Sequence, residues 1–256
     1  MSQNSMMVAD QLFATDNDLE VPALDMAMQA TECQIPFLCF GEQRRTYNLN
    51  DEGTLHFYTD DYRFNAVYEH PEKILQHNPH AIVEPNFSLF NETPIAFGLQ
   101  AIYKKRFIAR AMQERGIQVF VDLNVGQKFY RLNMLGVPRG WRAFATRGYS
   151  DRLNNLAFEY SIAQDWAGGK PLFVIYGGGE VCRRFAQQHG CIYINPVVTT
   201  KKQIEAIKRI HEGIAFFNED FSISKQLEAL TPFTKQLEDF SETGERRIDI
   251  KDDCLQ

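Results

Sequence analysis

Between residues 81 and 196 the sequence repeats one pattern: a short apolar run, a polar or glycine-rich segment, and then a stretch with helical periodicity. Apolar runs such as 117–123 and 172–176 are typical of strands that are buried on both faces. Strands that alternate with helices pair in parallel through right-handed crossovers. The pattern predicts an α/β fold with a parallel β-sheet and alternating helices. Periodicity leaves open whether the sheet is an open three-layer sheet or a partial β/α barrel.

The pattern also places the individual elements. Strands are expected at residues 55–59, 81–84, 117–123, 141–145, 172–176 and 191–194, and the run 34–40 is expected to form an edge strand or to plug the core. Helices are expected at 63–75, from Thr93 and Pro94 to 115, from Ser150 or Asp151 to 166, at 181–188, and at 199–217. Pro71 should break the first helix, and Gly116 should end the second.

Three segments follow from this assignment. Residues 1–53 are expected to form an N-terminal arm, and residues 54–218 the α/β domain. Residues 219–256 are expected to form an acidic C-terminal tail without fixed structure, because polar and acidic residues dominate it.

Charge is distributed unevenly along the chain. Residues 101–150 contain ten lysines and arginines but two acids, Glu114 and Asp122, which gives +8. Since the whole chain carries −6, the remainder carries −14. A basic middle segment can attract phosphates or other anions. The alternative is that these cations coat the solvated faces of helices.

The carboxyl ends of parallel strands lie at one end of a sheet or barrel, where ligands bind. The segments that follow the strands supply the candidate ligand-binding residues Asn86, Ser88, Asn124, Thr146, Arg147, Gly177, Gly178, Gly179, Glu180 and Arg183. The three glycines should expose backbone N–H groups at a helix N-terminus, which favours anions. Arg183 lies in the first turns of that helix, where it opposes the dipole unless an anion lies between.

Two residues are candidates for catalysis. Asp122 ends a strand and could act as a general base, or could simply cap a turn. Glu84 ends the neighbouring strand, so both carboxylates together could hold Mg²⁺, although we assign no metal site. Tyr149 also follows a strand and could be a nucleophile of the kind that nicking enzymes use.

Several of these segments resemble a known family. Ile-Val-Glu-Pro-Asn-Phe-Ser-Leu at 82–89, Val-Phe-Val-Asp-Leu-Asn-Val at 119–125, Ala-Thr-Arg-Gly at 145–148 and Val-Ile-Tyr-Gly-Gly at 174–178 resemble domain-of-unknown-function family 4417. The resemblance covers about residues 54–196. The chain departs from the family pattern at Asn86, where the family has an aspartate, and at Val125-Gly126, where it often has a tryptophan. The resemblance implies a mobile-element setting, in a plasmid or phage, with DNA replication or maintenance as the expected process.

These observations leave three functions open. The first is a protein that handles phosphate-bearing ligands, with nucleic acid or nucleotide as the partner. The second is a small-molecule enzyme with its site at the strand ends, and the third is a non-catalytic protein that binds a partner through the acidic tail. No cofactor is indicated, and enzyme activity stays open. The odd number of five cysteines and the lack of an apolar run of about 18 to 20 residues favour a cytoplasmic protein without a membrane partner.

Overall fold

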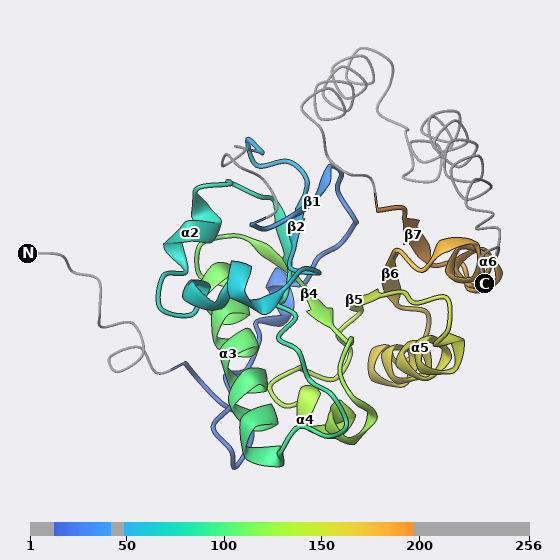
Figure 1. The fold of residues 1–256 in the computed structure, drawn as a ribbon. Helices are drawn as coiled ribbons and strands as arrows, with labels where there is room; N and C mark the ends of the chain where they lie inside the picture. The colour runs from blue at the N-terminus through green and yellow to red at the C-terminus, as the bar shows by residue number, and fades with distance from the viewer. Residues whose placement is uncertain (1–12, 42–48, 197–256) are drawn as a thin grey trace, which may run out of the picture. The chain divides into compact units, whose positions relative to one another are not determined.

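A computed structural model describes residues 13–41 and 49–196 of the 256-residue chain (Figure 1). The expected helix at 199–217 and the expected acidic tail at 219–256 lie outside the described residues.

The centre of the described chain is a seven-stranded, entirely parallel sheet whose strands are ordered as in the sequence. The strands are β1 (Phe37–Cys39), β2 (Thr54–His56), β3 (Ala81–Val83), β4 (Gln118–Asp122), β5 (Ala143–Arg147), β6 (Leu172–Tyr176) and β7 (Ile192–Ile194). The predicted α/β class with a parallel sheet is therefore confirmed, and the apolar run 34–40 supplies the edge strand β1.

The sheet curls into a nearly closed barrel. Each connection leads to the next strand in the same direction, which is the arrangement of a β/α barrel rather than of an open three-layer sheet. Tyr176 at the end of β6 contacts Phe37 of β1 and His56 of β2, with ring centroids 5.9 and 4.2 Å apart. Strands from opposite ends of the strand order thus meet through side chains in the interior.

Helices and short 3-10 turns connect the strands. They are η1 (Met26–Met28), η2 (Asp61–Arg63), η3 (Asn65–Val67), α2 (Glu72–Leu75), α3 (Ile95–Gln113), η4 (Gln127–Phe129), α4 (Tyr130–Asn133), α5 (Leu153–Ala167) and α6 (Gly179–His189). Helix α3 packs on β4, α5 on β5 and α6 on β7.

The helix starts differ from the sequence prediction. Helix α3 begins after Pro94, and the Thr93 hydroxyl accepts the N–H of Phe90 (3.1 Å) instead of capping the helix. Helix α5 begins after Arg152 without a side-chain cap, so the predicted caps Ser150 and Asp151 are wrong. Caps require a fixed side-chain rotamer beside the first turn, and sequence position alone does not set that rotamer.

The predicted helix at 63–75 is mostly wrong as well. A 3-10 turn occupies Asn65–Val67, and only Glu72–Leu75 is α-helical, after the expected break at Pro71. Proline lacks the N–H that would continue a helix and occupies its start without cost. The chain leaves the helix close to the predicted end: α3 stops at Gln113, and Gly116, three residues later, adopts φ +82°.

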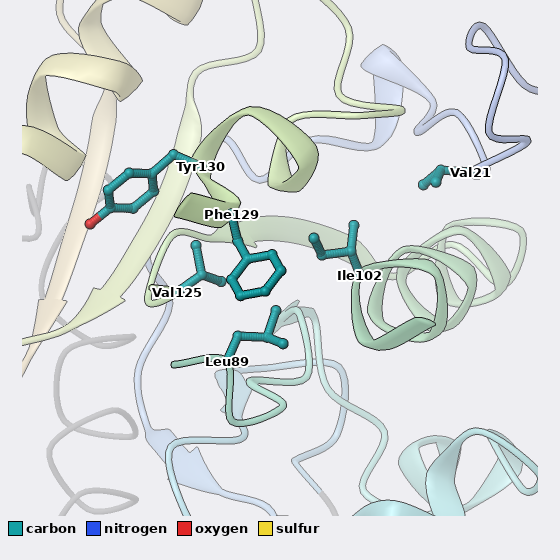
Figure 2. Close-up of a cluster of buried hydrophobic side chains, with 6 residues drawn as sticks. All are labelled: Val21, Leu89, Ile102, Val125, Phe129 and Tyr130. Carbon is teal, nitrogen blue, oxygen red and sulfur yellow. The ribbon is translucent and has the colours of Figure 1, made fainter. Parts of the chain in front are cut away.

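A hydrophobic cluster fixes the segments that follow β3 and β4 against α3 (Figure 2). The Phe129 ring lies beside Val125 and Leu89, and Ile102 of α3 faces it from the other side. The same ring lies so close to Gly98 of α3 that no side chain fits at that position. The loops at this end of the barrel therefore rest on packed core and hold their side chains in place.

No helix within the described ranges is sufficiently long and apolar to cross a membrane.

Candidate functional site

The inner face of the barrel collects polar side chains at the carboxyl ends of the strands. Arg147 of β5 is paired with Tyr176 of β6, and Asp122 of β4 is paired with Ala145 of β5. Paired residues share a face, as do residues two apart along a strand, so Asp122, Arg147 and Tyr176 lie on one face. Because the Tyr176 ring contacts His56, that face is the interior of the barrel.

A buried group of four charges lies where β3 and β4 separate. The Arg106 guanidinium donates to Glu84 Oε1, and Lys105 Nζ lies 3.2 Å from Asp122 Oδ2 and 3.8 Å from Glu84 Oε2. Glu84 Oε2 also accepts the backbone N–H of Asp122 (3.2 Å), which closes the gap between the strands. All four side chains are at most 1% exposed, and their formal charges cancel. Since Lys105 and Arg106 neutralise both carboxylates, a buried cation is already present where we had considered Mg²⁺.

Both oxygens of the Asp122 carboxylate are occupied. Oδ1 accepts the Tyr58 hydroxyl and the backbone N–H of Asn124, each at 3.2 Å. Oδ2 accepts Lys105 Nζ and the Asn86 amide, again at 3.2 Å, and the Asn86 oxygen accepts the Asn124 amide. A carboxylate whose two oxygens each accept two hydrogen bonds holds its neighbours in place, so this geometry favours an organising role. The general-base assignment of Asp122 stays a prediction.

His56 presents an unmatched hydrogen-bond donor to the interior. Its Nδ1 accepts the backbone N–H of Tyr58 (3.2 Å), so the neutral ring carries its proton on Nε2. Burial, and secondly the charge of Arg147, lowers the pKa of His56 to about 3. Within the described ranges Nε2 has no partner, although the residue is 1% exposed. Such a buried polar atom calls for a ligand or a water.

Two guanidinium groups flank Tyr149 after β5. Arg152 lies 4.7 Å and Arg147 5.5 Å from the centre of the ring. Neither forms an ion pair with an acid of residues 13–41 or 49–196. Burial raises the pKa of Tyr58 well above its usual value, and the charges of Asp122 and Tyr149 raise it further. The contribution of Tyr149 is the smallest of these.

The glycine segment joins the ends of β5 and β6. Gly177, Gly178 and Gly179 all have left-handed backbone angles, with φ +78°, +84° and +64°. A side chain at Gly178 would come within 2.8 Å of the backbone nitrogen of Tyr149, so the two loops touch. Gly178 precedes α6 and contributes no side-chain cap, so among the described residues no side chain caps the N–H groups of the first turn.

Two other predicted residues are engaged by neighbours. The Glu180 carboxylate accepts Arg183 Nε (2.6 Å) and Arg184 Nε (2.9 Å). The anion expected between these arginines and the start of α6 is thus a carboxylate of the helix itself. Ser88 donates its hydroxyl and its N–H to the Asp61 carboxylate at 2.9 and 3.0 Å. Both contacts favour structural roles, and ligand binding by these residues stays a prediction.

Thr146 faces away from the interior, toward α5. Its hydroxyl lies 2.6 Å from Glu159 Oε2, and the Tyr130 hydroxyl lies 3.4 Å from Oε1. Burial raises the pKa of Glu159 to about 8, and the charge of Asp122 contributes, while the two hydroxyl contacts oppose the shift. Glu159 is therefore mostly a neutral acid at pH 7.

The basic middle segment does not act as one surface. Lys105 and Arg106 are buried, Arg110 pairs with Glu114 (3.5 Å), and Arg139 pairs with Asp165 (2.9 Å). Helix α3 consequently directs two of its cations into the core rather than toward the glycine segment. At the end of β5 the arginines without an acidic partner among the described residues are Arg147 and Arg152, so the positively charged area is smaller than the basic segment 101–150 predicted.

Sequence reasoning missed His56, Tyr58 and Lys105. His56 and Tyr58 stand two residues apart around the end of a strand, a spacing that places both on one face. Lys105 and Arg106 stand three and four residues after Ile102, on the apolar stripe of α3. Cations at core positions of a helix indicate buried acids elsewhere in the chain, and this signal was available.

Comparison with known proteins agrees with the resemblance found in the sequence. The chain is 35% identical over 79 residues to the Gene 1 proteins of Mycobacterium phages L5 and D29. That stretch is 30% of this chain and spans 34% and 29% of the two phage proteins. No solved structure matches the chain. The domain of unknown function DUF4417 matches residues 13–175, so it begins earlier and ends earlier than the motifs suggested, and the chain belongs to this family.

Proposed function

We propose that the protein binds a phosphate-bearing ligand at the carboxyl ends of β5 and β6. The observation that carries the proposal is the pair of guanidinium groups on Tyr149, which lack a carboxylate partner within the described ranges. Arginine presents a planar fork of donors that matches phosphate oxygens. The start of α6 lies against Tyr149 and adds backbone N–H groups and a positive dipole end.

The charge balance of the interior supports an anion. The four buried charges around Asp122 cancel, and Glu159 retains its proton below a pKa of about 8. His56 is neutral above a pKa of about 3 and offers its Nε2–H as a donor. On the described inner face, Arg147 is then a cation without a carboxylate partner. An anionic ligand would neutralise its positive charge.

Ligand-dependent stabilisation tests the proposal. Inorganic phosphate, pyrophosphate and ADP should raise the thermal midpoint of the full chain, and added NaCl should weaken the effect. Arg147→Met should weaken phosphate binding about tenfold or more, because charge-assisted hydrogen bonds contribute about 1.5–3 kcal/mol. Arg139→Met is the matched control, since Arg139 also lies on an aromatic ring, Trp166, at 3.8 Å, but on the segment that enters β5. Equal loss in both variants, or no stabilisation by any of the three anions, would reject the proposal.

A covalent role for Tyr149 is the second candidate. Tyr149 follows β5, and two guanidinium groups flank its ring. In this reaction Tyr149 Oη forms an ester bond with the phosphorus of a phosphodiester. The bond to the departing alcohol breaks, and the tyrosine proton ends on that alcohol. Wild type should then give an adduct with single-stranded DNA that survives SDS, whereas Tyr149→Phe should bind without forming it. If wild type forms no adduct, the covalent role is wrong, and only the proposal of phosphate binding remains.

The phage relatives support a mobile-element setting for this activity. A phosphate-binding site is compatible with a task on DNA during replication or maintenance, and the same binding assays with oligonucleotides test that extension.

A further inference from the structure

Large apolar side chains are exposed almost entirely at one end of the barrel. Of the eight that are exposed in the described chain, seven follow a strand or occupy the first two turns of the helix behind it, and Leu19 is the exception. Four of the seven are aromatic: Tyr62, Phe90, Phe97 and Phe158, with exposed fractions of 72, 60, 66 and 49%. We call these four rings the aromatic belt. Exposed apolar groups that gather on one side of a protein indicate a binding surface.

Hydrogen bonds connect the loops that carry the belt. They run from Ser88 to Asp61 (2.9 Å), from the Gly126 N–H to Leu89 O (2.6 Å) and from Gln127 to Asn155 (3.2 Å). The Phe158 ring packs on Tyr130 at 4.9 Å. The loops after β2, β3 and β4 are thereby joined to α5. Two residues of the cluster in Figure 2, Leu89 and Tyr130, take part in these contacts.

We propose that the belt binds single-stranded nucleic acid, whose bases stack on the rings while a phosphate lies at Arg147. This inference rests on the proposed function and names the ligand class of the same site. Aromatic rings interleaved with cations are the usual platform for single strands, because every base has a face that can stack. A duplex would hide those faces, and a mononucleotide would engage one ring at most.

Cations accompany the rings around this end. Arg63 lies 5.4 Å from the centre of the Tyr62 ring and also 3.9 Å from the exposed Asp60 carboxylate, and Lys128 and Arg131 are exposed in the segment after β4. The acids Glu92 and Asp151 are exposed at the same end and reduce the positive electrostatic potential there. The expected affinity is therefore moderate and falls as salt rises, with the rings supplying a part that salt does not screen.

Fluorescence anisotropy with labelled dT20 tests the inference on the full chain. Wild type should bind dT20 more tightly than a matched duplex and more tightly than dTMP. The Phe90→Ala/Phe97→Ala variant should weaken dT20 binding about tenfold or more, since stacking contributes about 1–3 kcal/mol per base. The same variant should keep the stabilisation by inorganic phosphate. Leu19→Ala is the control, because it removes an exposed apolar side chain (47%) outside the belt.

The outcomes separate the two proposals. If phosphate stabilises the protein through Arg147 but dT20 binds no better than dTMP, or the double variant binds dT20 as wild type does, the nucleic-acid inference is wrong and the proposed function stands. If neither phosphate nor pyrophosphate nor ADP stabilises the protein and Arg147→Met changes nothing, the proposed function is wrong. A wild-type dimer in light scattering that the double variant converts to monomer would show that the belt joins two copies, and would also overturn the inference.

Discussion

Glu159→Gln should change how stability depends on pH, and the buried carboxyl sets the size of the effect. Glu159 is 5% exposed, and burial raises its pKa from 4.5 to about 8. The folded state then holds a proton that the unfolded state releases between pH 4.5 and 8. Stability therefore falls as pH rises across that window, by about 1.4 kcal/mol per pH unit and by about 5 kcal/mol in total.

His56 acts in the opposite direction over a lower window. Its folded pKa is about 3 against 6.5 in the unfolded chain, so the unfolded state binds the extra proton between these values. The contribution of His56 is complete above pH 6.5 and is lost as pH falls toward 3. Between pH 4.5 and 6.5 the two slopes oppose each other. Considering these two groups alone, wild type should have a plateau there and lose stability from pH 6.5 to 8.

The glutamine variant removes one of the two slopes. The difference in unfolding free energy between Glu159→Gln and wild type should be constant below pH 4.5, rise in favour of the variant up to pH 8, and level off above it. Urea unfolding followed by the fluorescence of Trp141 and Trp166 measures it at half-unit steps. Glu180→Gln is the control, since its exposed carboxylate pairs with arginines and should not reproduce that rise. A difference that stays constant from pH 4.5 to 8 would refute the claim that Glu159 is protonated in the fold.

Three further substitutions test the packing of the site. Lys105→Met should cost about 3–5 kcal/mol of stability by urea unfolding, because it leaves buried carboxylates uncompensated, and adding Asp122→Asn should recover part of that loss. Asn86→Asp places a second carboxylate about 3.2 Å from Asp122 Oδ2, so it should lower the thermal midpoint at pH 8 and recover at pH 5 or with added Mg²⁺. Gly178→Ala should destabilise more than Gly179→Ala in the same assay. Both have positive φ, but a new methyl group meets the Tyr149 backbone at Gly178 and nothing within 4 Å at Gly179.

The role of Asn86 could be understood only from the structure. In the sequence it was a position where an expected aspartate was missing. In the structure its amide donates to Asp122 and to the backbone of Asn124 at 3.2 and 3.1 Å. A carboxylate could not donate to either, so an aspartate at this position would require a proton or a cation.

The local sequence pattern was sufficient to predict the strands and to predict which end of the barrel carries the candidate site. Apolar runs of the right length between helical stretches predict parallel strands, and parallel strands necessarily end together. Gly178 and Arg147 could therefore be placed near each other without coordinates. The capping residues were predicted less well than the helix starts, as Thr93 and Ser150 or Asp151 show, because a cap depends on one side-chain rotamer.

The tertiary structure alone decided the rest. Whether the sheet closes depends on Tyr176 reaching His56, more than a hundred residues away in the chain, and no local periodicity encodes such a contact. The directions of Thr146 toward α5 and of Arg147 into the barrel follow from strand register, where a shift of one residue exchanges the two faces. The pairing of Lys105 with Asp122 likewise required two elements to meet. Local preferences belong to each segment by itself, whereas the lack of an acidic partner for Arg147 among the described residues is known only once the fold has placed every other charge.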